Sequence, residues 1–272
     1  MTHHTPSRPQ APLDQASGLR RLFGPARRCL LPVVANPFLP DVQAVLELLS
    51  AALAAQGRQV LVVDAAGTAP LPQEITRLDL AAGVERLHGR VSYLAARGLP
   101  LAYVDTRGCA AAFVDAAFDA APASDVVLLH ADPTDLARML GQRAARPLLL
   151  GSEGIESIKQ TYAGCKLLVQ RCALMTFDLL LAARPAQVRV DAIVERLCSC
   201  ADTFLGAVVR DFAVVDPLAD PLAAQDADLA RVLGAQLLQD ESVRRQHALR
   251  TATRSGAPPA RRQADPRATA SY

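Results

Sequence analysis

Two carboxylates in this chain of 272 residues follow short apolar runs that are typical of β-strands. Asp64 ends the run 60–64, and Asp105 ends the run 101–105. In an open parallel sheet, ligands bind beyond the carboxyl ends of the strands. Asp64 and Asp105 are therefore expected at the edge where a nucleotide would bind, together with the turn that follows the first strand.

That turn lacks the residues that a phosphate-binding loop needs. Residues 35–44 read ANPFLPDVQA, without Gly, Lys, Ser or Thr. Glycines let backbone N–H groups approach phosphate, Lys neutralises the β- and γ-phosphates, and Ser or Thr ligates magnesium. Pro37 and Pro40 supply no N–H group, and Asp41 would repel a phosphate. The turn therefore predicts poor binding of a nucleoside triphosphate.

The cysteines and histidines do not indicate a metal site. The six Cys include no CxxC pair, none has a His at zinc spacing, and the five His are scattered. Cys198 and Cys200 form a CxC without a second pair, which is a weak metal signal. Cys165 and Cys172 lie on one predicted helical face, where packing in the core is the simpler interpretation. We expect reduced thiols and no metal.

Short apolar runs alternate with helical patterns along the body of the chain. The candidate strands are residues 30–35, 60–64, 101–105, 126–131, 147–150 and 176–181. The candidate helices are residues 41–56, 110–120, 134–143, 156–171, 187–203 and 223–238. Near-continuous apolar strands with intervening helices predict a doubly wound, mostly parallel α/β sheet with helices on both faces. Pro32 is unusual for a central strand, because Pro belongs at strand edges and starts.

The two ends of the chain differ from its body in charge. Residues 1–28 hold five Arg and one Asp, and residues 240–272 hold seven Arg and three acidic residues, whereas the remainder has a net charge of −6. The predicted organisation is a flexible N-terminal arm (1–28) with a helix at 14–23, an α/β domain (29–239) and a basic disordered tail (240–272). Such basic ends suit an anionic partner, although a solvated tail is the simpler reading.

Several classes of protein are disfavoured. No apolar run approaches the roughly 20 residues that span a bilayer, and the polar N-terminus has no signal-peptide core, so we expect a cytoplasmic protein. Aromatic residues are 4% of the chain, which supplies few surfaces for stacking on single-stranded nucleic acid. Residues 228–238 carry a modest apolar stripe with Arg231 as the only cation, so this helix is expected to pack on the sheet. Membrane attachment should therefore be weak or indirect.

The N-terminal helix carries a specific motif, DQASGLR at residues 14–20. It resembles the DQAxxLR activator motif of the FlhG/FleN family, which are flagellar number and placement regulators of the MinD/ParA type of deviant P-loop ATPases. The matching positions are Asp14, Gln15, Ala16, Leu19 and Arg20.

The resemblance continues through the body, in the order and spacing of the family. Residues 52–64 resemble ALAxxGxxVLLVD, residues 104–108 resemble the switch II motif DTxAG, and residues 131–134 stand where the family has its TxPEPT turn. Residues 157–166 resemble a helix that often reads DAYALIK, and residues 204–206 match the late FLG.

The departures fall on the nucleotide site. Counted back from the ALAxxG match, the deviant Walker A motif KGGxGKT falls on residues 37–43, with its signature Lys at Pro37 and its P-loop Lys at Val42. Asp64 keeps the first acid of the family's DxD, but Ala66 replaces the second. The Asn that contacts adenine has no counterpart near Leu181 or Ala182.

The resemblance thus implies a degenerate nucleotide site marked by Pro37, Val42, Asp64 and Asp105, with no catalytic residue and no cofactor. It implies a regulator of flagellar number, placement and assembly whose arm stimulates the signal-recognition-type GTPase FlhF, with Gln15 orienting the attacking water. Further implied partners are flagellar C-ring proteins, a flagellar transcriptional regulator or a second copy in a homodimer, but no direct nucleic acid. Recruitment to the cell pole or the inner face of the membrane would follow.

Three alternatives stay open. The first is an active MinD/ParA-type ATPase that uses ATP and magnesium through an unrecognised loop. The second is a non-catalytic flagellar scaffold or adaptor without effect on any GTPase. The third concerns the motif alone, since residues 14–23 could be an amphipathic arm packed on its own domain.

Overall fold

The computed structural model describes residues 28–141, 143–184, 190–221 and 226–238. The predicted arm helix at 14–23, with its motif residues, and the predicted tail at 240–272 lie outside these residues.

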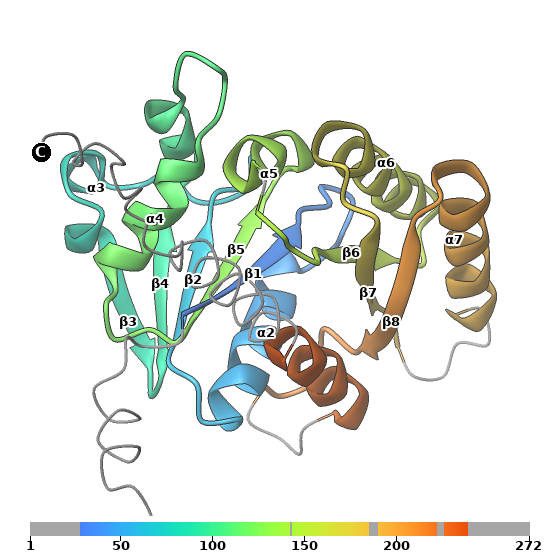
Figure 1. The fold of residues 1–272 in the computed structure, drawn as a ribbon. Helices are drawn as coiled ribbons and strands as arrows, with labels where there is room; N and C mark the ends of the chain where they lie inside the picture. Colours follow the sequence, from blue (N-terminus) through green and yellow to red (C-terminus); the bar gives the residue numbers. More distant parts are fainter. Residues whose placement is uncertain (1–27, 142, 185–189, 222–225, 239–272) are drawn as a thin grey trace, which may run out of the picture.

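The centre of the structure is an eight-stranded sheet with the strand order β3-β4-β2-β5-β1-β6-β7-β8 (Figure 1). All neighbours pair in parallel except β3 and β4, which form an antiparallel hairpin. The strands are β1 (Cys29–Val34), β2 (Val60–Asp64), β3 (Val84–His88), β4 (Val91–Ala95), β5 (Val126–Ala131), β6 (Leu148–Ser152), β7 (Thr176–Ala182) and β8 (Val208–Val215). The doubly wound, mostly parallel α/β fold is therefore confirmed.

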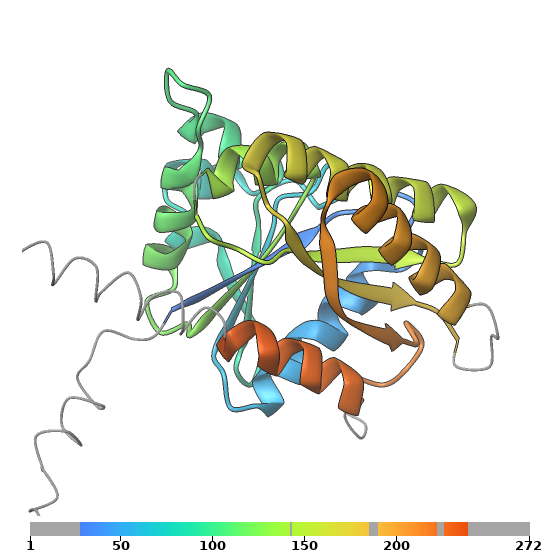
Figure 2. The same ribbon diagram turned by 45° about the vertical axis from the view of Figure 1, so that its right-hand side comes forward.

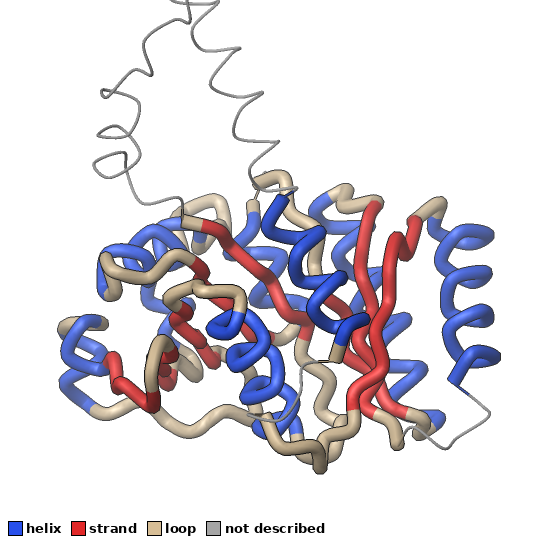
Figure 3. Tube along the Cα trace, turned by 90° about the horizontal axis from the view of Figure 1, so that it is seen from below, coloured by secondary structure: helices blue, strands red, loops and turns tan. Residues whose placement is uncertain are grey.

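Helices cover both faces of the sheet, as Figures 1 and 2 show. One face packs against α4 (Ala111–Ala120), α5 (Pro133–Leu140), α6 (Ile155–Cys172) and α7 (Val190–Leu205). The other packs against α2 (Val42–Ala55) and the helical residues 227–238, which lie side by side (Figure 3). The short α3 (Glu74–Leu78) lies near the β3–β4 hairpin. Each face thus has its own apolar core, which explains the near-continuous apolar strands.

Five of the six predicted strands are present, and the sixth is wrong. Residues Leu99–Tyr103 form a 3₁₀-helix instead of the expected strand at 101–105. Gly98 adopts a left-handed conformation (φ 77°) before it, and Pro100 lies in its first turn, where a missing N–H is tolerated. The strand beside β2 is β4, whose sequence VSYLA mixes polar and apolar residues and gives a weak pattern.

Pro32 lies in the central strand β1 without breaking the sheet. Cys29 and Ala35 donate their N–H groups to carbonyls on the β5 side, so alternate residues, including Pro32, face β6. Pairing with β6 begins only at Val33 and Val34. The absent N–H of Pro32 therefore falls where β6 offers no partner.

The sequence predicts Asp41 as the N-cap of α2 and Gly57 as the residue that ends it, and the structure agrees at Gly57 but differs at Asp41. Gly57 follows the helix with φ 82°, as expected of a glycine that ends a helix. Asp41 occupies the predicted N-cap position, but its side chain makes no capping hydrogen bond and its φ is 52°. A left-handed non-glycine residue is uncommon, and Asp is one of the residues that tolerate it.

The helix 227–238 packs on the sheet, as its apolar stripe predicts. Its buried residues in the core are Leu229, Val232, Leu233 and Leu237. All six cysteines are free, and Cys165 is buried in the core as expected. Among the described residues, none of the helices combines the length and the apolar character that crossing a bilayer requires.

A buried ion pair links the segment before β6 to β7, and a hydrogen bond from Gln236 joins the helix 227–238 to it. Arg146 Nε lies 3.0 Å from Asp178 Oδ2, and Gln236 Nε2 donates to the same oxygen at 2.7 Å. All three residues are at most 6% exposed. Burial raises the pKa of Asp178 to about 6, and the Arg146 charge opposes the rise.

Candidate functional site

The candidate site lies at the carboxyl edge of the sheet, where residues 35–41 connect β1 to α2. Pro37 lies within this turn, and Val42 is the first residue of α2. A phosphate-binding loop of a doubly wound fold would occupy this position. The geometry of the turn therefore decides whether a phosphate fits.

The side chain of Asn36 holds the turn closed. It is 4% exposed, and its Nδ2 lies 3.0 Å from Leu150 O, 2.9 Å from Ser157 O and Oγ, and 3.1 Å from Thr161 Oγ1. Its Oδ1 accepts the N–H of Phe38 at 3.1 Å, an N–H that a phosphate loop would present to its ligand. Asn36 thus fixes the turn to β6 and α6 and uses a donor of the turn internally.

The rest of the turn is apolar or acidic. Leu39 is buried, and its N–H binds the carbonyl of Asn36 at 3.0 Å. Pro37 and Pro40 have no N–H, and Asp41 places a carboxylate beside the start of α2, where a phosphate would lie. The residues present therefore do not fit ATP with magnesium, and the poor binding of a nucleoside triphosphate stays a prediction.

Asp64 lies at the end of β2 as predicted, but it is enclosed. The carboxylate is bonded to His130 Nδ1 at 2.8 Å, and the Tyr93 hydroxyl donates to it at 3.3 Å. Asp64 and His130 are both nearly inaccessible to solvent. Burial, together with the charge and hydrogen bond of Asp64, raises the pKa of Tyr93. Asp64 thus links β2 to β4 and β5 through hydrogen bonds, and these contacts stabilise the sheet.

Asp105 does not end a strand, so its predicted position is wrong. It follows the 3₁₀-helix and is exposed in a loop. Its Oδ1 accepts the N–H groups of Arg107 at 2.8 Å and Cys109 at 2.9 Å. These two bonds, with the Cys109 bond the larger effect, lower the pKa of Asp105. Asp105 organises its own loop.

The residues that the sequence prediction missed are His130, which lies in β5, and Asp132, which follows this strand. This strand lies between β1 and β2, so His130 and Asp132 stand at the edge beside Asp64. Asp132 Oδ2 accepts the N–H of Gly67 at 2.9 Å. The apolar run 126–131 was visible in the sequence, but its place in the strand order was not. Among the described residues, no group of three or more His, Cys, Asp or Glu is arranged to hold a metal ion.

A cavity of about 790 Å³ opens beside the turn. Its walls come from the turn itself and from the segments that follow β6, β7 and β8. Arg184 is the only cation among the lining residues that the structure describes, and Asp41 and Glu153 contribute carboxylates. Phe38 and Leu218 line it and are largely exposed. The cavity is large enough for a ligand, but its charges do not favour a triphosphate.

Replacing Asn36 should destabilise the protein. We expect Asn36→Ala to lower the free energy of unfolding by about 2–3 kcal/mol, because a buried donor and the acceptor for Phe38 are both lost. Asn36→Asp keeps the shape but faces carbonyl oxygens without a donor, so its loss should be at least as large. Urea unfolding measures both.

The matched control is Gln43→Ala on the exposed side of α2. It should change the stability by less than about 0.5 kcal/mol. Equal stability of the Asn36 variants and this control would show that Asn36 does not hold the turn.

Known structures share this fold. The chain superposes on a plasmid partition protein from Borrelia burgdorferi with a TM-score of 0.52, 8% identity, and coverage of 78% of this chain and 96% of that one. It superposes on the MinD cell division protein of Aquifex aeolicus with a TM-score of 0.51 and 12% identity, and the match covers 76% of this chain and 97% of that one. For apo McdA from Cyanthece the TM-score is 0.50 and the identity 14%, and the match covers 78% of this chain and 99% of that one. No protein-family model matches the sequence, and no curated protein matches it.

The likeness establishes the architecture. These neighbours are MinD/ParA-type proteins, so the fold is that of the MinD/ParA-like P-loop ATPases, as the sequence resemblance implied. At identities of 8% to 14%, the match concerns the fold alone.

Proposed function

We propose that this chain is a FlhG-like regulator of flagellar number and placement that no longer hydrolyses ATP and acts through its N-terminal arm on the GTPase FlhF. The observation that carries the proposal is the turn 35–41 within a MinD/ParA-like fold. That fold normally presents glycine N–H groups and Lys to phosphate at this place. Here Asn36 uses one of the N–H groups, and prolines remove others.

The arm supplies the second support. The motif DQASGLR is separated from β1 by residues 21–28, which include Gly24 and Pro25. Those two residues favour the end of a helix. A polar side chain such as Gln15 can orient the attacking water of a GTPase in trans, so an activator of this kind needs no nucleotide site of its own.

The alternatives lead to different measurements. A flagellar scaffold would bind its partner without changing GTP hydrolysis. An active ATPase would bind ATP and magnesium at micromolar concentration. A GTPase assay of FlhF and an ATP titration therefore separate the three.

The purified protein should show no ATP turnover. We expect no magnesium-dependent phosphate release above buffer, because the turn offers neither the Lys nor the N–H groups that stabilise the transferring phosphoryl group. Calorimetric titration should detect no ATP binding at micromolar concentrations.

Asp64→Asn is the appropriate control variant, because Asp64 is buried between His130 and Tyr93 and a truncation would leave them unpaired. Turnover that the wild type shows and this variant loses would contradict the proposal. It would support the active ATPase.

A further inference from the structure

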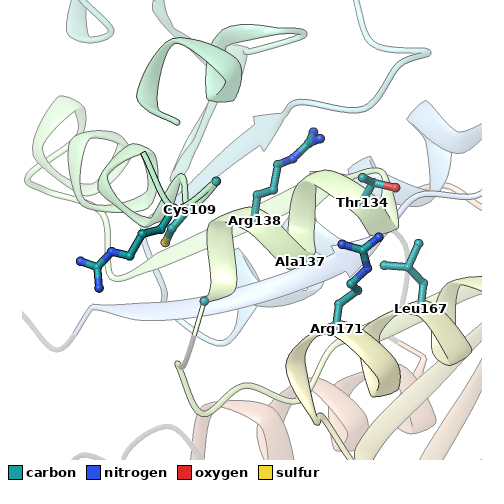
Figure 4. Close-up of a pocket in the computed structure, with 9 residues that line it drawn as sticks. Cys109, Thr134, Ala137, Arg138, Leu167 and Arg171 are labelled. Carbon is teal, nitrogen blue, oxygen red and sulfur yellow. The ribbon is translucent and has the colours of Figure 1, made fainter. Parts of the chain in front are cut away.

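A second cavity, of about 340 Å³, lies away from the turn, on the α4–α7 side of the sheet. Its walls are the loop 107–109, α5 and the end of α6 (Figure 4). Three of the nine described lining residues are arginines, namely Arg107, Arg138 and Arg171, and none of the nine is acidic. The body of the chain has a net negative charge, so this concentration of positive charge is not a consequence of composition.

Contacts among the walls hold the cavity in shape. Ala110 donates its N–H to Arg138 O at 2.9 Å, which fixes the loop to α5. Cys172 Sγ contacts Ala137 O at 3.6 Å, which joins α6 to α5. Gly108 has a φ of 79°, which gives the loop its sharp turn. The Asp105 carboxylate accepts the backbone N–H groups of Arg107 and Cys109 in the same loop. These contacts fix the position of the loop and of α6 relative to α5.

The nearby carboxylates do not neutralise all of the positive charge of the three arginines. Asp135 binds Arg138 Nη1 at 2.8 Å on the surface of α5. Asp105 lies 4.0 Å from Arg107, whose side chain is 89% exposed. Within the described residues, Arg171 has no carboxylate partner. In Figure 4 its guanidinium group is directed from α6 toward α5, on the side of Thr134, whose hydroxyl can also donate to an anion.

We propose that this cavity binds a small anion with two or more negative charges, a phosphorylated or polycarboxylate metabolite, through Arg138 and Arg171. Guanidinium groups bind carboxylate and phosphate oxygens in pairs, and two of them, one on α5 and one on α6, match a ligand with several charged oxygens. The volume suits a small metabolite. The proposal does not depend on the proposed function, because the cavity shares no residue with the turn 35–41.

The test uses the full chain at constant ionic strength, with pyrophosphate and citrate as probes. Cys109 lines the cavity, so a bound anion should slow its alkylation by N-ethylmaleimide, followed by mass spectrometry. Cys200 on α7 serves as the internal reference, because it lies outside the cavity. Calorimetry gives the affinity, and the stronger probe identifies phosphate or carboxylate as the preferred group.

Arg171→Ala should weaken binding by about tenfold or more, since it removes a hydrogen bond to a charged group. Arg196→Ala, an exposed arginine on α7, is the matched control and should bind like the wild type. Absence of slowing at Cys109, or equal slowing in the Arg171 variant, would overturn the proposal. Protection by a DNA duplex but by neither small anion would also overturn it, in favour of a nucleic-acid surface.

Discussion

Under the proposed function, replacing Gln15 by Ala should lower the stimulation of GTP hydrolysis by FlhF roughly tenfold or more. The reason is that a side chain which orients the attacking water acts in the transition state, so its loss lowers the rate more than the affinity. Leu19→Ala should instead weaken binding, because it removes apolar contact with the partner. Single-turnover GTP hydrolysis and a binding titration measure the two effects separately.

The matched control is Ser17→Ala, at a variable position of the DQAxxLR motif. It should keep both binding and stimulation. A synthetic peptide of residues 10–28 should also accelerate hydrolysis by itself. If the chain without residues 1–28 binds FlhF equally well and hydrolysis never changes, the activator role is wrong and the scaffold alternative takes its place.

Arg146→Ala should lower the free energy of unfolding by about 3–5 kcal/mol, because it leaves Asp178 as an unpaired buried charge. Arg143→Ala, three residues earlier, removes an exposed ion pair with Asp115 and should cost less than about 1 kcal/mol. The double variant Arg146→Met with Asp178→Leu should recover much of the loss, since it removes both charges together. Urea unfolding measures the stability of the three variants. If Arg146→Ala and Arg143→Ala lower the free energy of unfolding equally, the buried ion pair does not contribute to stability as proposed.

The pH dependence provides an independent check on this pair. Burial raises the pKa of Asp178 to about 6, so the folded protein holds this proton more tightly than the unfolded chain does. Relative to Asp178→Asn, the stability of the wild type should therefore be highest below about pH 4 and fall as the pH rises through about 6. A difference that stays constant over this range would contradict the raised pKa.

The sequence predicted the central strands well because they are buried on both faces. Strands β1, β2 and β5 carry almost unbroken apolar runs, and these are where prediction and structure agree. Strands β3, β4 and β8 were missed. Of these, β3 and β8 lie at the two edges of the sheet, where charged residues such as Arg86 and Asp211 interrupt the pattern.

The candidate site was predictable only where it depended on residue types. Pro37 and the absence of Lys or Gly in the turn follow directly from the sequence. The role of Asn36 depends on Ser157 and Thr161, which are more than 100 residues away, so no local pattern could indicate it. Asp105 was misplaced because an apolar run before a carboxylate is also compatible with a 3₁₀-helix that packs on the core.

The most direct test is GTP hydrolysis by FlhF with and without the full-length protein, measured in the complete absence of ATP and again with ATP and magnesium added. A regulator that has lost its phosphate-binding turn and acts through its arm should accelerate hydrolysis to the same extent in both conditions. Acceleration that appears only when ATP is present would contradict this account, because it would require a working nucleotide site, and no acceleration in either condition would contradict the action on FlhF.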